Sequence, residues 1–477
     1  MGVGTIASTG STIITAKTGR LKRRIAFGVI ALVVLLVGGG VWLGGGFDGG
    51  NGGTVDRIAV ADAKLPELGD AKPVLASLAT DAPVPQPGAL AAQVGPLLHA
   101  PALGSGVSAS VVDVASGDVL LDQDAAEPSM PASTAKLLTA VAALTTLNPA
   151  ETLKTTVVAG SAPGEVVLVG GGDPTLSRTA PSKTYAGAPT IKDLATQVMA
   201  ARPAGDPVTR VVVDSSLYSG PLTASGWQPS DTPSSYAAPV TATAVDGARL
   251  GPGSTARSGQ PGIDAGAALA DALGAPGATV VLGEAPGHGK TLATVHSAPI
   301  ARLVEQALSM SDNMLAEALA RQVALARDLP ASFQGSAQAV TDALTEDGVD
   351  LTGVKLSDGS GLSREDRVPT GVLTAVLRGA ADGSLKSASF LLSGLPVAGY
   401  DGTLADRGDA DPHDAPGTVR AKTGTLLGIH ALAGTATTSD GRLLTFAVVA
   451  DQPAGNEAAA EDALDAFAAG LAGCGCR

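Results

Sequence analysis

Ser133 and Lys136 form an S-x-x-K pattern at the start of an Ala- and Leu-rich segment that predicts a buried helix. Residues three apart share one helix face, so the lysine amine can reach the serine hydroxyl. In a partly desolvated pocket the pKa of a lysine falls, and the neutral amine can then accept the serine proton. The pattern indicates a serine nucleophile with a lysine base. The alternative is a helix start with a solvated lysine, which the isolated motif favours.

Ser311, Asp312 and Asn313 form a second polar group, inside LSMSDNMLAEAL. At a bend, Ser311 and Asn313 would present a hydroxyl and a carboxamide to one cleft, where the first relays a proton and the second holds a substrate amide. The alternative is an N-cap for a helix at Met314, which any of the three side chains would serve.

Lys422, Thr423 and Gly424 lie on an expected strand, in RAKTGTL. A cation and a hydroxyl suit a substrate carboxylate, and glycine lets a substrate approach the backbone closely. A second K-T-G occurs at residues 17–19, so the triplet alone decides nothing. The three motifs together, in this order, are those of penicillin-binding proteins and serine β-lactamases.

Composition excludes several other kinds of site. The net charge of −14 argues against a nucleic-acid partner, and five histidines without an H-x-x-x-H pair argue against a zinc site. Cys474 and Cys476 stand at the chain end, where their C-x-C spacing indicates a tolerated tail. GEAPGHGKT resembles a phosphate-binding loop, but Glu284 replaces its first glycine. We therefore expect no metal and no cofactor.

The elements that must position these residues are expected on both sides of an insert. A hairpin is predicted over 106–121, and strands over 354–363, 419–426, 430–438 and 443–451. Helices are predicted over 91–99, 131–147, 299–327, 370–378 and 456–471. Residues 148–289 change to strands, turns and small residues, with one helix over 191–201, and are expected to form an inserted domain. The catalytic part would then comprise 89–147 and 290–477.

The N-terminal region predicts a membrane anchor. Residues 25–43 carry no charge over about the length of a bilayer core, and 1–24 hold five basic side chains. Residues 1–24 would form a cytoplasmic tip, 25–43 a single membrane span and 44–88 a Gly- and Pro-rich stalk. The catalytic part would lie outside the cytoplasm. A cleaved signal peptide is the alternative.

The chain resembles the D-alanyl-D-alanine carboxypeptidase/endopeptidase family, the low-molecular-mass class C penicillin-binding proteins. The likeness runs from about residue 106 to 451, through PASTAKLLTAVAAL, GGGDPTL, VDSSLYSG, residues 227–236, MSDNMLAEALAR, SDGSGLSRED and AKTGTL. It implies an α+β fold, a transpeptidase-type antiparallel sheet flanked by helices and interrupted by an inserted domain. Because the insert is shorter than in many members, we expect one inserted domain.

The resemblance also implies roles for individual residues in the cleavage of peptidoglycan stem peptides. Ser133 would attack the carbonyl between two D-alanines, with Lys136 as base. Ser311 would relay the proton with help from Lys422, and Asn313 would hold the substrate amide. Thr423 and Lys422 would bind the terminal carboxylate beside Gly424, and the N–H groups of Ser133 and Thr425 would form the oxyanion hole. β-Lactams would acylate Ser133 as covalent inhibitors.

Two further residues are implied less directly. Asp231 and Arg364 would bind the amino and carboxylate ends of a diaminopimelate-type side chain; the alternative for each is a solvated surface charge. Two other functions stay open: a cell-wall binding protein that keeps the fold without activity, and a β-lactamase.

Overall fold

The computed structural model describes residues 81–407, 417–454 and 456–477, which all lie in one compact unit, Pro73–Arg477. The expected cytoplasmic tip, membrane span and most of the stalk lie outside the described residues. Within the described part of the chain, no helix is both long and apolar enough to cross a membrane.

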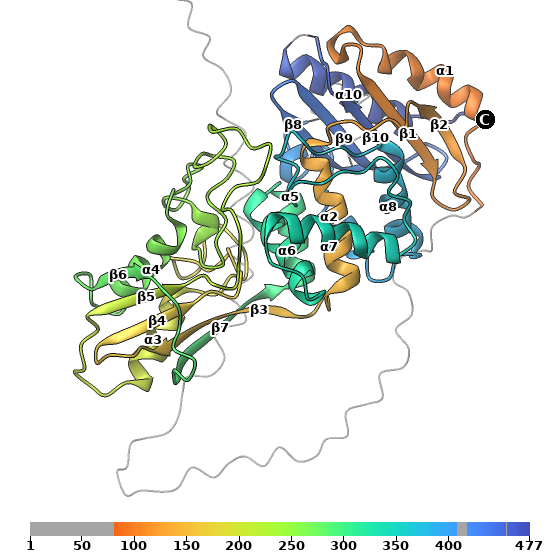
Figure 1. Ribbon diagram of the computed structural model, residues 1–477. Coiled ribbons are helices and arrows are strands. Elements are labelled where there is room, and N and C mark those ends of the chain that lie inside the picture. The colour runs from red at the N-terminus through yellow and green to blue at the C-terminus, as the bar shows by residue number, and fades with distance from the viewer. Residues whose placement is uncertain (1–80, 408–416, 455) are drawn as a thin grey trace, which may run out of the picture. The chain divides into compact units, whose positions relative to one another are not determined.

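The first sheet is antiparallel and joins distant parts of the sequence (Figure 1). In spatial order it consists of β2 (Val119–Gln123), β1 (Val107–Asp113), β10 (Leu443–Ala450), β9 (Ile429–Thr437) and β8 (Val419–Leu426). β1 pairs with β10 in the register Val111↔Phe446. The expected hairpin and all three expected C-terminal strands are therefore present, and β8 is an edge strand.

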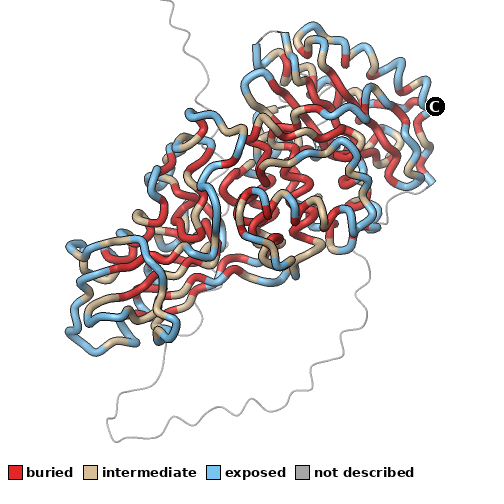
Figure 2. The backbone as a smooth tube through the Cα atoms, viewed as in Figure 1, coloured by how far each residue is buried: buried red, intermediate tan, exposed pale blue. Residues whose placement is uncertain are grey.

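Helices cover both faces of this sheet, as expected for the α+β fold. One face carries α1 (Pro87–Leu98) and α10 (Glu457–Ala472). The other carries α2 (Lys136–Thr146), α5 (Ile300–Ser309), α6 (Asn313–Ala326), α7 (Phe333–Glu346), α8 (Thr370–Asp382) and α9 (Phe390–Gly394). Alternate residues of β10 enter the two cores: Phe446 faces α10, whereas Ala447 faces the α2 side. Figure 2 shows the resulting buried layers.

A second, mixed sheet forms the insert. Its spatial order is β6 (Thr279–Leu282), β5 (Arg210–Asp214), β4 (Glu165–Val169), β3 (Thr152–Ala159) and β7 (Thr291–Pro299). The β4–β5 and β5–β6 pairs are parallel, and β3 is antiparallel to both neighbours. Two helices, α3 (Ile191–Ala201) and α4 (Pro261–Ala272), share its apolar core. The expected helix over 191–201 is confirmed, and α4 was not predicted.

The insert ends ten residues later than predicted, at Pro299 instead of 289. Residues 291–299 form β7, which pairs with β3 in the register Thr156↔Thr294. This strand therefore belongs to the inserted sheet and not to the catalytic part. The two ends of the insert lie together, since Ile300 N donates to Glu151 O at 2.8 Å.

Three other expected elements differ from the structure. The helix predicted over 299–327 is two helices, because the backbone turns at Ser311 with φ +50°. Residues 354–363, expected as a strand, form a loop that is buried from 358 to 363. The helix predicted from residue 91 begins at Pro87, inside the expected stalk, because proline suits the first helical turn.

The C-terminal tail packs into the core instead of projecting from it. Cys474 and Cys476 are joined by a disulfide and buried beside α1. The backbone of Gln86 donates to Cys476 O at 2.7 Å.

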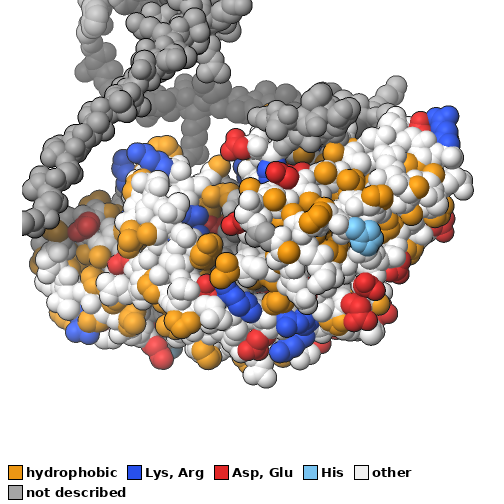
Figure 3. Space-filling view, turned by 90° about the horizontal axis from the view of Figure 1, so that it is seen from above, with side chains coloured by type: hydrophobic (Ala, Val, Ile, Leu, Met, Phe, Trp, Pro, Cys, Tyr) orange, Lys and Arg blue, Asp and Glu red, His pale blue; other side chains and the backbone are white. Residues whose placement is uncertain are grey.

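Lys and Arg side chains lie in small groups among acidic and apolar ones on the face shown in Figure 3.

Candidate active site

Ser133 and Lys136 lie at the junction of a 3₁₀ turn, Ala132–Ala135, with α2. Lys136 Nζ donates to Ser133 Oγ at 2.9 Å, to Asn313 Oδ1 at 2.6 Å and to Ser360 O at 2.7 Å. The lysine is only 1% exposed. The solvated-lysine interpretation of the S-x-x-K pattern is therefore wrong, and the amine lies within reach of the hydroxyl.

Burial lowers the pKa of Lys136 to about 8, against the opposing charges of Asp358, Glu317 and Asp312. An appreciable fraction of the amine is then neutral close to neutral pH. A neutral amine offers Ser133 a lone pair, so the hydrogen bond between them can reverse and the hydroxyl can donate its proton.

Ser311 and Asn313 face this pair from the break between α5 and α6. Asn313 Oδ1 accepts from Lys136, and its Nδ2 donates to Tyr236 O at 3.1 Å. Asp312 Oδ1 accepts from the N–H groups of Met314 at 2.9 Å and Leu315 at 3.2 Å. Asp312 therefore caps α6, as the alternative interpretation predicts, while Ser311 and Asn313 line the cleft.

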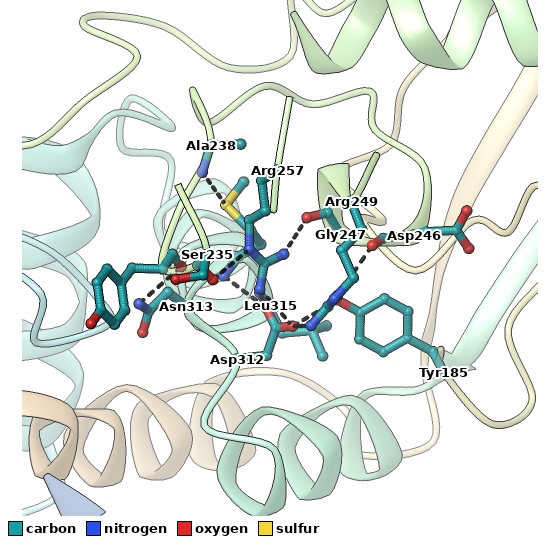
Figure 4. A network of polar contacts seen from close by, with 12 residues as sticks. Tyr185, Ser235, Ala238, Asp246, Gly247, Arg249, Arg257, Asp312, Asn313 and Leu315 are labelled. Carbon is teal, nitrogen blue, oxygen red and sulfur yellow. Dashed lines mark hydrogen bonds and ion pairs between the residues drawn. The ribbon is translucent and has the colours of Figure 1, made fainter. Parts of the chain in front are cut away.

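The other carboxylate oxygen of Asp312 ties the motif to the insert (Figure 4). Asp312 Oδ2 accepts from Tyr185 at 2.8 Å, Arg249 at 2.9 Å and Arg257 at 3.2 Å. Burial alone would raise the pKa of this carboxyl, but the two arginines hold it below its usual range. Sequence reasoning missed these three residues because no short motif contains them.

Lys422, Thr423 and Gly424 lie on β8 beside the 3₁₀ turn that carries Ser133. A Cβ on Gly424 would stand 2.9 Å from Pro131 O. The glycine thus lets the strand lie against that turn, besides any approach of a substrate. Lys422 is fully buried, and burial with the nearby charge of Lys136 places its pKa well below the usual value.

A cavity of about 320 Å³ brings the predicted residues together. Its walls include Ser133, Ser311, Asn313, Thr423 and Thr425. The sequence did not single out other lining residues: Leu362, Thr403, Arg407, Leu426 and Glu461. Thr403 Oγ1 lies 2.9 Å from Thr423 Oγ1, and Thr425 Oγ1 donates to Glu461 at 3.3 Å.

Asp231 and Arg364 line a second hollow of about 800 Å³, which shares Tyr236 and Thr425 with the first. Arg364 Nη1 lies 3.0 Å from Asp231 Oδ2, and the Asp231 side chain is 6% exposed. The two residues therefore form an ion pair next to the cleft, in which Asp231 is buried and the Arg364 side chain is 28% exposed. Within the described ranges, no three His, Cys, Asp or Glu side chains are arranged to hold a metal ion.

Comparison with known proteins identifies the family. The model of the D-Ala-D-Ala carboxypeptidase 3 (S13) family matches residues 90–256 and 249–471. The chain belongs to this family. This S13 carboxypeptidase is 40% identical to Carboxypeptidase DacB of Mycolicibacterium smegmatis, over 96% of this chain and 98% of that relative. It is 39% identical to a carboxypeptidase of Mycobacterium tuberculosis, over 87% of this chain and 90% of the relative.

The S13 carboxypeptidase also shares its fold with a solved structure, penicillin-binding protein 4 of Haemophilus influenzae. The TM-score is 0.65 at 24% identity, covering 79% of this chain and 98% of the other. The expected family and the expected α+β transpeptidase fold are thus confirmed. The enzyme is a serine-type D-Ala-D-Ala carboxypeptidase by family membership.

Proposed function

We propose that this carboxypeptidase cleaves the terminal D-Ala-D-Ala bond of peptidoglycan stem peptides through an acyl-enzyme on Ser133. The observation that carries this proposal is the 2.9 Å contact between Lys136 Nζ and Ser133 Oγ inside a buried polar site. The lysine has other acceptors in Asn313 and Ser360, so its position does not depend on the serine.

In the first half of the reaction, neutral Lys136 takes the proton of the Ser133 hydroxyl as Oγ attacks the carbonyl of the penultimate D-alanine. The N–H groups of Ser133 and Thr425 stabilise the oxyanion; removing one such donor typically costs about 10²–10³ in rate. The C–N bond then breaks, and Ser311 passes a proton to the leaving D-alanine amine. Water attacks the ester in the second half and releases the shortened peptide.

Substrate recognition is assigned to the residues around Ser133. Asn313 binds the amide of the peptide, and Thr423 with Lys422 binds the terminal carboxylate. A bound carboxylate also favours the charged form of Lys422, whose own surroundings disfavour it. Asp231 and Arg364 carry opposite charges side by side, so one side-chain end with an ammonium and a carboxylate can exchange partners with both.

The test is labelling of the purified protein with a fluorescent penicillin, beside D-alanine release from defined stem peptides. We expect Ser133 to be acylated, Ser133→Ala to remain unlabelled, and D-alanine to be released. Labelling that persists in Ser133→Ala contradicts the proposal. Wall binding without D-alanine release would identify a non-enzymatic protein, and rapid loss of the label by hydrolysis would identify a β-lactamase. Cross-linked peptide dimers as substrate measure any endopeptidase activity.

We further propose that residues 25–43 anchor the enzyme in the membrane with its catalytic part outside the cytoplasm. The support is the uncharged segment behind five basic residues. Externally added protease should degrade the catalytic part in whole cells stripped of wall, and deletion of 1–43 should move it to the soluble fraction. Protection from the protease would contradict this orientation.

A further inference from the structure

Asp358 lies in the buried loop below the active site, outside the three motifs that indicated the chemistry. It is 1% exposed, and its carboxylate accepts four hydrogen bonds. Oδ1 accepts from Ser360 N at 3.0 Å and Gly361 N at 2.6 Å. Oδ2 accepts from Trp227 Nε1 at 2.7 Å and Ser363 N at 2.8 Å.

The loop that Asp358 holds touches the catalytic pair directly. Ser360 O accepts from Lys136 Nζ at 2.7 Å, and Gly359 O accepts from Thr139 Oγ1 on α2 at 2.7 Å. A Cβ on Gly361 would stand 1.9 Å from Ala132 O, next to the nucleophile. The position of this loop therefore fixes one of the acceptors around the lysine and one side of the turn that carries Ser133.

We propose that Asp358 is a positioning residue for Lys136, and that it connects the lysine to the insert through Trp227. Its carboxylate accepts from the N–H groups of Ser360 and Gly361 and so fixes the Ser360 carbonyl that holds the lysine amine. This inference rests on the proposed role of Lys136 as the base.

The same carboxylate is connected to the hollow lined by Asp231 and Arg364. Trp227 is followed by Gln228, whose N–H donates to Asp231 Oδ2 at 2.6 Å. Ser363, a donor to Asp358, precedes Arg364 in the chain. The chain segments that carry Asp231 and Arg364 are thus both hydrogen-bonded to Asp358, which in turn holds the loop that contacts Lys136.

Electrostatics support the geometry. The acidic groups that act on Lys136 are Asp358, Glu317 and Asp312, and the cations are Arg257 and Lys422. Asp358 is the strongest of the charges that raise the pKa of the lysine. The neighbouring carboxyl of Asp366 is harder to ionise, because burial and the charge of Asp358 place the pKa of Asp366 well above the usual value.

The decisive variant is Asp358→Asn in the full chain, measured as the rate constant of acylation by fluorescent penicillin across pH. An amide presents N–H groups where Trp227 and Ser363 donate, so we expect the maximal rate to fall by at least ~10-fold. Loss of the negative charge lowers the pKa of Lys136, so the acid limb should move by about 0.5–1 unit to lower pH.

Two comparison variants separate positioning from folding. Trp227→Phe removes one donor and keeps the charge, so we expect a lower rate with an unmoved pH midpoint. Asp214→Asn alters a buried carboxylate in the insert that also accepts two backbone N–H groups, from Ser216 and Ala285. We expect it to lower the unfolding temperature without changing either the rate or the midpoint.

The proposal is overturned if Asp358→Asn keeps the midpoint of the parent protein. If that variant does not fold, Trp227→Phe decides, and an unchanged acylation rate overturns the proposal. Failure of the proposed function is distinguishable, because the parent protein itself would then remain unlabelled at every pH.

Discussion

Ala132 and Ser311 are non-glycine residues in the left-handed backbone region, with φ of +46° and +50°. Such residues cost about 1–3 kcal/mol each and persist only where the surroundings hold them. Here one directly precedes Ser133 and the other is the relay serine itself. The backbone on both sides of the cleft is therefore held in place by packing, most closely at Gly361 and Gly424.

Replacing Gly361 by alanine should disable the site. The residue has φ +76°, and a Cβ would overlap Ala132 O at 1.9 Å, so the turn carrying Ser133 must shift. We expect penicillin acylation to fall by at least ~10-fold. Gly383→Ala is the matched control, since it has φ +78° and open space around the Cβ position. It should lose about 1 kcal/mol of stability and keep its acylation rate; equal rates in both variants would contradict the argument.

The rate of acylation should rise with pH through about 8. Lys136 must be neutral to accept the Ser133 proton, and its pKa lies at about 8. Below that pH the amine is charged and the rate falls about tenfold per unit, whereas above it the rate levels off. Labelling kinetics from about pH 5 to 10 measure this, and a flat profile would exclude the lysine as base. Lys136→Arg, which keeps the charge at every pH, should not be acylated.

At the scale of elements, the break between α5 and α6 joins the catalytic part to the insert through Asp312. The Asp312 side chain caps a helix and pairs with two arginines, the partly buried Arg249 and the buried Arg257. Because the insert supplies both arginines, packing of the inserted domain and placement of Ser311 and Asn313 depend on the same carboxylate.

Asp312→Ala should therefore destabilise the fold by about 3–5 kcal/mol, since it leaves the charges of Arg249 and Arg257 without the carboxylate that both now contact. Asp206→Ala breaks the exposed pair with Arg202 and should cost no more than about 1 kcal/mol. Denaturant unfolding measures both.

The arginines lower the pKa of Asp312 below its ordinary 3.8. Its contribution is thus present above about pH 4 and is lost as the pH falls further. Equal costs for the two variants would contradict this role.

Elements with a strong local pattern could be predicted from the sequence. The β8 strand and α3 have the predicted bounds, because alternating or helically spaced apolar residues determine both. The loop at 354–363 was mistaken for a strand, since its order comes from Asp358 and Glu317 side chains and not from a neighbouring strand. The strand β7 was assigned to the wrong domain because pairing with β3 has no local signal.

The site was predictable to a similar extent. The three motifs could be recognised because each is a short run whose residue types suit the chemistry. The structure places residues of all three around one cavity. The remaining contacts could not be predicted, because they use main-chain atoms or partners far along the chain. The carbonyl of Ser360 has no sequence signature, and Arg257 meets Asp312 across 55 positions.

At the scale of the whole molecule, the bounds of the insert can be tested by deletion. Removing 152–299 and joining the ends is feasible because Glu151 and Ile300 are already in contact. Removing 148–289 leaves β7 without its partner strand. We expect the second deletion to aggregate more, since an unpaired apolar strand promotes association. Neither should be labelled by penicillin, because Asn313 loses the Tyr236 carbonyl. Soluble yield and labelling are the measurements, and equal solubility would contradict the revised boundary.

The pairing of β1 with β10 has a consequence for synthesis. A ribosome makes β1 more than 300 positions before β10, so until the chain is nearly complete β1 can pair with β2 but not with its second neighbour, β10. Ser133 and Lys136 emerge early but cannot meet β8 before then. Fragments that stop short of Leu443 should therefore expose β1 to proteases and chaperones, and catalytic competence should arise late and all at once.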